Sequence, residues 1–275
     1  MRIKSEKISS RANPTVVLVS SLAEKKYRER HRLFRTDGIK LAEELFKRGI
    51  SPELVLLRES SLGRLEGLIN TDVDCEAVVL ADSVFDRLSD EKSPEGIICV
   101  VKHLDNFRKI ATIDNNAVIS GGQKVERILL LEAMRDPGNF GTVLRSALAF
   151  GVDRVVVSDD SVDLYNPRVL RASMGAAFDV KIDAVPSLTE AIEELRRQGR
   201  RVFAAALDRE AVSLDRLELR EGDCFAIGNE GHGLLKTTVD ACDRSVFIPI
   251  GERSESLNAA AAAAIILWEQ KRQLG

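Results

Sequence analysis

Cysteine and histidine are scarce in this sequence, and their placement argues against redox and metal sites. There are four cysteines and three histidines among 275 residues. No two cysteines have the Cys-x-x-Cys spacing, and Cys75, Cys99 and Cys224 lie in or beside apolar strand-like runs, so we expect buried, reduced thiols. The histidines are scattered without the spacing of metal ligands, so we expect no metal.

Long apolar runs are also missing. No uninterrupted stretch approaches the roughly 20 residues that a membrane-spanning helix needs, and the amino terminus, MRIKSEKISSRANP, lacks the apolar core of a signal peptide. Hydrophobic residues nevertheless make up 44% of the chain and charged residues 30%, which is typical of a globular protein with a core. We therefore expect a cytoplasmic protein with no membrane contact.

Neither of the two common glycine-rich nucleotide fingerprints is present. The sequence contains no GxGxxG dinucleotide motif and no GxxxxGK[ST] phosphate loop. A nicotinamide-dependent oxidoreductase, which an α/β pattern alone would allow, is therefore disfavoured.

What the second half does contain is a regular alternation of apolar runs and helical patterns. The runs ILLLEA, DRVVVSD, RVFAAAL, CFAIGN and SVFIPI fit strands that are buried on both faces, as in a parallel sheet covered by helices. The helical patterns lie at 140–150, 167–174, 188–198 and 256–273. The sequence therefore predicts an α/β domain with a parallel sheet over residues 126–275.

Residues 1–110 predict a second, smaller α/β domain. Short runs rich in Val, Ile and Leu are typical of strands, and one short charged segment is helical in pattern. The predicted strands are 53–57, 76–80 and 96–101, and the predicted helix is 40–48. The polar stretch 111–125, which contains a Gly-Gly pair, is the predicted linker.

Three segments rich in glycine and asparagine stand where a predicted strand ends. They read AMRDPGNFGTVLRSALAFG (133–151), FAIGNEGHGL (225–234) and IPIGERSESLNAAAAAAI (248–265). In open α/β sheets ligands bind at the carboxyl ends of the strands, where helix amino ends also converge. We therefore expect the three segments to form one site.

Four polar residues in these segments allow both a structural and a functional interpretation. Asn139 follows the turn DPG, where it can cap the next helix, and Arg145 lies on that helix, where it can form a surface ion pair or bind an anion. Glu230 is either an exposed turn carboxylate or a group that orients a ligand. Asn258 is unusual inside a helix and is more simply interpreted as a hydrogen-bonding group directed into a site.

Taken together, the three segments resemble the signature motifs of the SpoU-type, or TrmH-like, RNA ribose 2′-O-methyltransferases of the SPOUT superfamily. The resemblance runs from about residue 126 to the end, and YNPRVLRASMGA at 165–176 is also typical of these enzymes. Residues 1–110 resemble the ribosomal-protein-like substrate-binding domain of many members. FRTDG at 34–38 is similar to its usual F-x-x-E-G, with Asp in place of Glu.

The resemblance implies methylation of a ribose 2′-hydroxyl in RNA with S-adenosylmethionine as donor. It also implies a trefoil knot in the parallel-sheet domain and a homodimer whose site is completed at the interface. Ribosomal RNA of the 23S type is the favoured substrate, because the amino-terminal domain resembles those of ribosomal RNA enzymes. A transfer RNA methyltransferase and a non-catalytic RNA-binding or ribosome-assembly protein of the same fold are the alternatives.

Motif matching also implies roles for single residues. The catalytic residues would be Asn139, Arg145, Glu230, Ser256 and Asn258, and the cofactor would be bound near Gly228, Ile248 and Leu257. A guanidinium is protonated at ordinary pH, so we expect Arg145 to stabilise the developing alkoxide while an RNA phosphate or Glu230 helps with the proton.

The segment KKYRERHRLFR at 25–35 carries six Lys and Arg side chains against one Glu. Such a run can follow a phosphate backbone even on a chain with a formal net charge of −3, although a solvated helix face is the alternative. The predicted RNA-binding residues are Lys25, Lys26, Arg28, Arg30, Arg32, Arg35, Arg168 and Arg171.

Overall fold

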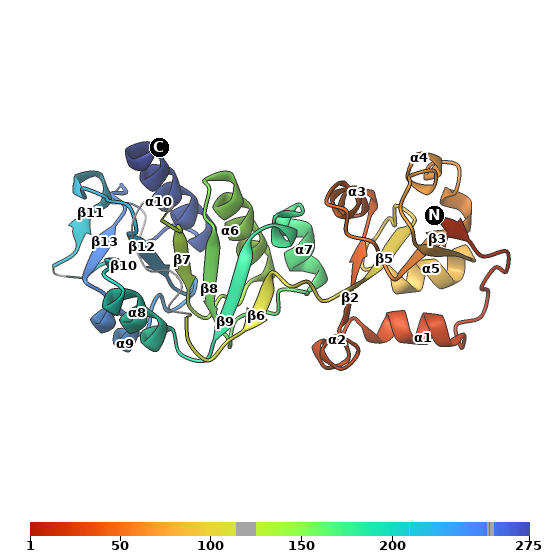
Figure 1. The fold of residues 1–275 in the computed structure, drawn as a ribbon, viewed down its shortest axis with the longest axis horizontal. Helices are drawn as coiled ribbons and strands as arrows, with labels where there is room; N and C mark the ends of the chain where they lie inside the picture. The colour runs from red at the N-terminus through yellow and green to blue at the C-terminus, as the bar shows by residue number, and fades with distance from the viewer. Residues whose placement is uncertain (114–124, 209, 252, 254–255) are drawn as a thin grey trace. The chain divides into compact units, whose positions relative to one another are not determined.

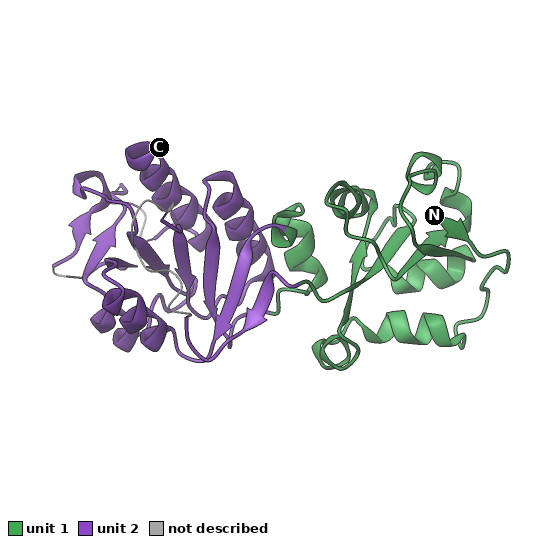
Figure 2. Ribbon diagram, viewed as in Figure 1, with its two compact units in different colours: residues 1–104, 163–178 green, residues 105–162, 179–275 purple. Residues whose placement is uncertain are grey.

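The computed structural model describes residues 1–113, 125–208, 210–251, 253 and 256–275 (Figure 1). The chain divides into two compact units (Figure 2). The first consists of Met1–Leu104 and Asp163–Phe178, and the second of Asp105–Val162 and Asp179–Gly275. The predicted linker lies mostly outside the described residues.

The second unit is built on a parallel sheet, as predicted, and this sheet has eight strands among the described residues. Its order is β11-β13-β10-β12-β7-β8-β9-β6, and every pairing is parallel. The strands are β6 (Phe107–Lys109), β7 (Ile128–Leu131), β8 (Arg154–Ser158), β9 (Lys181–Val185), β10 (Val202–Ala205), β11 (Val212–Ser213), β12 (Cys224–Ile227) and β13 (Arg244–Phe247). The trefoil knot stays a prediction, because strand order alone does not define how a chain threads.

Helices cover both faces of this sheet, which is why its central strands are apolar on both sides. They are α6 (Pro137–Ala149), α8 (Leu188–Arg197), α9 (Lys236–Ala241) and α10 (Ala259–Leu274). Leu188, Ile192 and Leu195 of α8 pack in one core cluster with Ile128 and Leu130 of β7. Figure 1 shows α6 and α10 together on the opposite face, and the two helices pack against each other.

Strand β9 was not predicted, because Asp183 interrupts its apolar pattern. This carboxylate is 1% exposed and accepts hydrogen bonds from Arg108 Nε and Arg154 Nη1, each at 2.8 Å. A buried charge is tolerated when it is paired in this way. The contact also links β9 to β6 and β8, its neighbours in the sheet.

The first unit is a five-stranded mixed sheet with order β1-β4-β3-β5-β2. Its strands are β1 (Arg2–Ile3), β2 (Leu33–Asp37), β3 (Leu54–Arg58), β4 (Glu76–Leu80) and β5 (Ile97–Lys102). Its helices are α1 (Pro14–Ser21), α2 (Lys25–His31), α3 (Ile39–Lys47), α4 (Glu66–Ile69), α5 (Asp82–Leu88) and α7 (Pro167–Ser173). The three predicted strands and the predicted helix are confirmed to within a residue at either end.

Segment 163–178, which contains α7, belongs to the first unit although we expected it in the second domain. The reason is aromatic packing. The buried ring of Tyr165 stacks on that of Phe34, with ring centroids 4.5 Å apart. The ring centroids of Phe178 and Phe34 are 6.5 Å apart. Conversely, residues 105–110 lie in the second unit, because β6 pairs with β9.

The cysteines behave as predicted: all four are free, and Cys75, Cys99 and Cys224 are buried. Burial raises the pKa of the Cys99 and Cys224 thiols to about 12, so both stay protonated. Within the described residues, no group of three or more His, Cys, Asp or Glu side chains is arranged to hold a metal ion. Among the described helices none has the length and apolar character needed to span a membrane.

Candidate active site

The three glycine- and asparagine-rich segments follow β7, β12 and β13, so they leave the same edge of the parallel sheet. Strands β7 and β12 are neighbours, and the chain builds the sheet outward in opposite directions from them. Such a switch point is the usual ligand site of an open α/β sheet. Asn229 Nδ2 donates to the Ala133 carbonyl oxygen at 2.7 Å and so joins the loop after β12 to the loop after β7.

The loop after β12 folds back on itself tightly. Asn229 and Gly233 exchange both backbone hydrogen bonds, at 3.1 and 2.9 Å. A Cβ atom added to Gly228 would lie 2.1 Å from the carbonyl carbon of Gly233 and 2.3 Å from the amide nitrogen of Leu234. Glycine is therefore required at residue 228 by the close approach of backbone.

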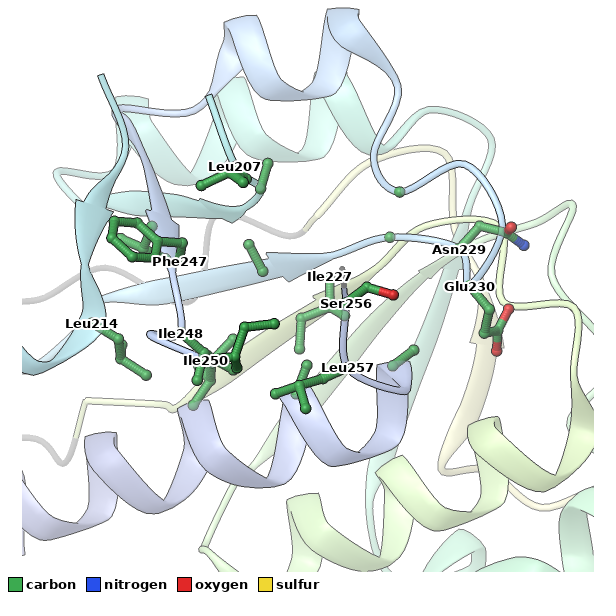
Figure 3. Close-up of a pocket in the computed structure, with 18 of the residues that line it drawn as sticks. Leu207, Leu214, Ile227, Asn229, Glu230, Phe247, Ile248, Ile250, Ser256 and Leu257 are labelled. Carbon is green, nitrogen blue, oxygen red and sulfur yellow. The ribbon is translucent and has the colours of Figure 1, made fainter. Parts of the chain in front are cut away.

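A cavity of about 600 Å³ opens beside this loop (Figure 3). The three predicted cofactor-binding residues, Gly228, Ile248 and Leu257, all line it. Figure 3 shows the side chains of Asn229 and Glu230 at one end of the cavity and apolar side chains toward the other. The apolar lining includes Leu207, Leu214, Ile227, Phe247, Ile250 and Ile266.

Two asparagines and one glutamate connect the three loops. Asn258 Nδ2 donates to Asn139 Oδ1 at 2.9 Å, and Asn139 Nδ2 donates to Glu230 Oε1 at 2.8 Å. Asn139 thus accepts from Asn258 and donates to Glu230, and Glu230 lines the cavity. Ser256 lines the same cavity. Four of the five predicted catalytic residues therefore lie at one edge.

The helix caps differ from the sequence interpretation. Asp136, not Asn139, caps α6, and its carboxylate accepts from the Asn139 amide nitrogen at 2.7 Å. Asn258 is itself the cap of α10, because it accepts from the amide nitrogens of Ala260 and Ala261 at 2.9 and 3.3 Å. Helix α10 accordingly begins at Ala259, three residues later than predicted. Asn258 therefore caps the helix and contacts the site with the same side chain.

Arg145 is placed differently from the other four. It is exposed on α6, does not line the cavity, and makes no ion pair or hydrogen bond with the residues that the structure describes. It stands six residues after Asn139, which corresponds to about 9 Å along the helix and a different face. Within one chain, Arg145 is separate from the Asn139–Glu230 contact.

The predicted RNA-binding residues fall into two groups. Lys25, Lys26, Arg30, Arg32 and Arg168 are exposed and Arg171 is half-buried. Arg28 and Arg35, which were also predicted to bind RNA, are instead buried, with exposed fractions of 3% and 4%.

Both buried arginines are paired within the protein, although Arg35 Nε is buried without a hydrogen-bond partner. Arg28 donates to Asp163 at 2.9 Å through Nε and to the Leu22 and Ala23 carbonyl oxygens through Nη1. Arg35 lies on β2 rather than on the basic helix, and it donates to Asp90 and to the Leu88 carbonyl oxygen. Neither guanidinium is available to a phosphate.

Sequence reasoning missed Glu132, which lies beneath the site. It is 5% exposed, and its carboxylate accepts from the Leu235 amide nitrogen at 2.7 Å and from the Thr238 hydroxyl. These contacts hold the start of α9 and hence the end of the glycine loop. An acidic residue directly after the apolar run ILLL was the only signal in the sequence.

Residues 126–268 match the model of the SpoU rRNA methylase family, and residues 13–99 match that of an MRM3-like substrate-binding domain. The chain belongs to the SpoU rRNA methylase family. The family resemblance seen in the three motifs is thereby confirmed.

Similar proteins align with nearly the whole chain. The 23S rRNA (guanosine(2553)-2′-O)-methyltransferase RlmP of Bacillus subtilis is 30% identical over 96% of this chain and 98% of its own. The crystal structure of an RNA 2′-O ribose methyltransferase has a TM-score of 0.79 and 28% identity, and the match covers 98% of this chain and 99% of that one. The SpoU methyltransferase AviRb from Streptomyces viridochromogenes, in complex with the cofactor AdoMet, has a TM-score of 0.75 and 25% identity, with coverage of 95% and 98%.

Proposed function

We propose that this protein methylates a ribose 2′-hydroxyl of 23S-type ribosomal RNA, in the cytoplasm, with S-adenosylmethionine as donor. The observation that carries this proposal is the cavity at the switch point of the sheet, where Gly228, Ile248 and Leu257 meet the Asn258–Asn139–Glu230 contacts. The activity of the Bacillus relative on 23S rRNA supports a large ribosomal RNA as substrate. The match of residues 13–99 to a substrate-binding domain supports a role of the amino-terminal domain in binding this RNA.

The cavity suits S-adenosylmethionine in size and in chemistry. Its volume of about 600 Å³ lies in the usual range for small-ligand sites. The apolar end formed by Ile248, Leu257 and Ile266 fits a purine ring, and the backbone of the three loops supplies hydrogen-bonding groups. When bound there, the donor supplies a methyl group on a positively charged sulfur.

Glu230 and its partners act on the attacking hydroxyl. A ribose hydroxyl is a weak nucleophile and must lose its proton as its oxygen bonds to the methyl carbon. The proton passes to the carboxylate of Glu230 or to a phosphate of the RNA. Asn139 holds Glu230 in place, Asn258 holds Asn139, and Ser256 helps to position the reacting groups, so the geometry is set before the substrate arrives.

Arg145 supplies a permanent positive charge to the developing alkoxide. Because it does not line the cavity of its own chain, we infer that it serves the cavity of a second copy in a homodimer. The face that carries it supports this inference. Leu148, Ile265 and Trp268, on α6 and α10, are 40%, 38% and 55% exposed, and the Trp268 ring lies 6.0 Å from that of Phe150. Adjacent exposed apolar side chains of this kind mark protein interfaces.

The direct test is methyl transfer in vitro. The purified protein is incubated with radiolabelled S-adenosylmethionine and total RNA from cells that lack it, and 2′-O-methyl sites are mapped by their resistance to alkaline hydrolysis. We expect label at one site of the large-subunit RNA and none in RNA from wild-type cells, whose site is already occupied. Label in transfer RNA alone would establish that alternative instead. Tight binding of RNA without transfer would identify a non-catalytic protein.

A further inference from the structure

A second cavity lies wholly within the first unit, where α2 ends and β2 begins. Its volume is about 380 Å³, and its lining residues are His31, Arg32, Leu33, Glu53, Lys102 and His103. Four of these six side chains are basic. The carboxylate of Glu53 is paired with Lys102 Nζ at 3.0 Å, so the positive charge that is left without a partner among the described residues is that of Arg32.

One wall of this cavity is the end of an aromatic stack. The ring of Tyr165 lies between those of Phe34 and His103, with centroid distances of 4.5 and 4.3 Å and interplanar angles of 21° and 23°. Tyr165 and Phe34 are buried. Since Tyr165 covers one face of the His103 ring and His103 also lines the cavity, the opposite face is the one on which a further ring can stack.

The other wall carries an arginine in an unusual backbone conformation. Arg32 ends α2 with a backbone φ of 56°, a left-handed value that residues other than glycine rarely adopt. Its carbonyl oxygen accepts a hydrogen bond from the His103 amide nitrogen at 2.9 Å. Its guanidinium is exposed and makes no ion pair with any residue in the described part of the chain. The turn thus holds an unpaired positive charge at the cavity that His103 also lines.

The charges around His103 favour a neutral ring in the absence of ligand. Burial lowers its pKa, and so do the nearby positive charges of Arg32 and Arg28, whereas Asp163 and Glu29 raise it. A phosphate bound beside Arg32 would add a negative charge and raise the pKa of His103.

We propose that this cavity binds one unstacked nucleotide of the RNA substrate, with its base on the open face of His103 and its phosphate against Arg32 and His31. The proposal rests on the proposed function. Sequence-specific RNA binding commonly relies on splayed bases that stack on aromatic side chains. RNA is favoured over a free nucleotide because Lys25, Lys26 and Arg30 are exposed on the same short helix, where they can follow the strand away from the cavity.

Histidine NMR tests the location of binding in the full-length protein. The chain has three histidines: two line this cavity and His232 lies in the glycine loop of the candidate active site. With a single-stranded RNA 8-mer as probe, we expect the signals of His31 and His103 to move and the pKa of His103 to rise. Guanosine 5′-monophosphate is the second probe. The proposal would be overturned if the His31 and His103 signals shifted with the mononucleotide but not with RNA. It would also be overturned if neither signal shifted at saturating RNA.

Methylation kinetics test its use by the enzyme. We expect His103→Ala to raise KM for ribosomal RNA about tenfold, in line with loss of one stacked base, with kcat and the affinity for S-adenosylmethionine unchanged. His103→Phe keeps a ring and should stay within about threefold of the wild-type KM. Arg32→Gly removes the charge while suiting the left-handed turn, so it should raise KM without lowering thermal stability.

Arg11→Ala is the matched control, because Arg11 is exposed in the same unit and lies outside the cavity. Wild-type KM values in both His103→Ala and Arg32→Gly would reject the nucleotide site while leaving the methyltransferase assignment intact. If the wild-type protein transfers no methyl group, the proposed function fails, and the NMR experiment still decides whether the cavity binds RNA.

Discussion

At the scale of single residues, arginines of similar appearance in the sequence have different roles in the structure. Arg28 is enclosed and paired with Asp163, which is 135 residues away along the chain. Arg145 is exposed, and the described residues offer it no carboxylate partner. An unpaired guanidinium on a helix that starts at the site is available to stabilise negative charge on a substrate.

Replacement of Arg145 by Ala should therefore reduce kcat for methyl transfer by roughly 100- to 1,000-fold, the usual cost of removing one group that stabilises a developing oxyanion. The affinity for S-adenosylmethionine should stay within about twofold, because Arg145 does not line the cavity of its own chain and its proposed contact is with the attacking oxygen. Filter-based methyl incorporation and isothermal calorimetry measure the two quantities. Arg145→Lys keeps the positive charge but loses the planar guanidinium, so its kcat should lie between those of the wild-type and Arg145→Ala enzymes. A fully active Arg145→Ala enzyme would contradict the assigned role.

At the scale of elements, the site depends on how strands end and helices begin. Asp136 and Asn258 cap α6 and α10, and both caps lie at the edge where the glycine loop closes after β12. Asn258 joins the start of α10 to Asn139 on α6. The alanine run 259–264 follows this cap directly, so the helix can pack closely beside α6 and the cavity.

The glycine loop yields a prediction of its own. Gly228→Ala would place a Cβ atom 2.1 Å from the backbone of Gly233, so the loop must open and the cavity must change shape. We expect the affinity for S-adenosylmethionine to fall at least about tenfold, measured by calorimetry, in a protein that still folds. Gly63→Ala is the control, because nothing lies within 4 Å of its added Cβ. Equal affinities in the two variants would show that the loop is not part of the donor site.

At the scale of the whole molecule, the site is proposed to use residues of two chains. The cavity with Glu230, Asn139 and Asn258 comes from one chain, and Arg145 is inferred to come from another, across the face that bears Leu148 and Trp268. An interface of this kind follows from two-fold symmetry, because the same patch then meets itself and creates two equal sites.

Mixing two impaired variants tests this arrangement, at an S-adenosylmethionine concentration that leaves the cavity of the Gly228→Ala chain largely empty. An Arg145→Ala chain has an intact cavity, and a Gly228→Ala chain has an intact Arg145. After subunit exchange at equal concentrations, about a quarter of wild-type activity should return, since half of the dimers are mixed and each mixed dimer has one complete site. Sedimentation velocity confirms the dimer, and each variant incubated alone is the control. Mixtures as inactive as their components would mean that Arg145 acts within its own chain.

Much of the fold and of the site followed from local features of the sequence. Apolar runs of strand length predicted five of the eight strands in the large sheet, and β9 was missed because Asp183 breaks the pattern. The three residues predicted to bind the cofactor line one cavity, because parallel strands deliver their carboxyl ends to one edge. The final helix was placed three residues too early, because a cap is defined by the backbone groups that it binds.

By itself, then, the sequence determined the parallel α/β sheet, the three loops at its edge and the family, since periodicity and glycine placement are properties of neighbouring residues. Only the tertiary structure decided that Arg28 and Arg35 are buried, that segment 163–178 packs with the first unit, and that Arg145 stands apart from the cavity. The physical reason is that burial of a charge or a ring depends on its partner. Asp163 for Arg28 and Phe34 for Tyr165 are more than a hundred residues away in the chain.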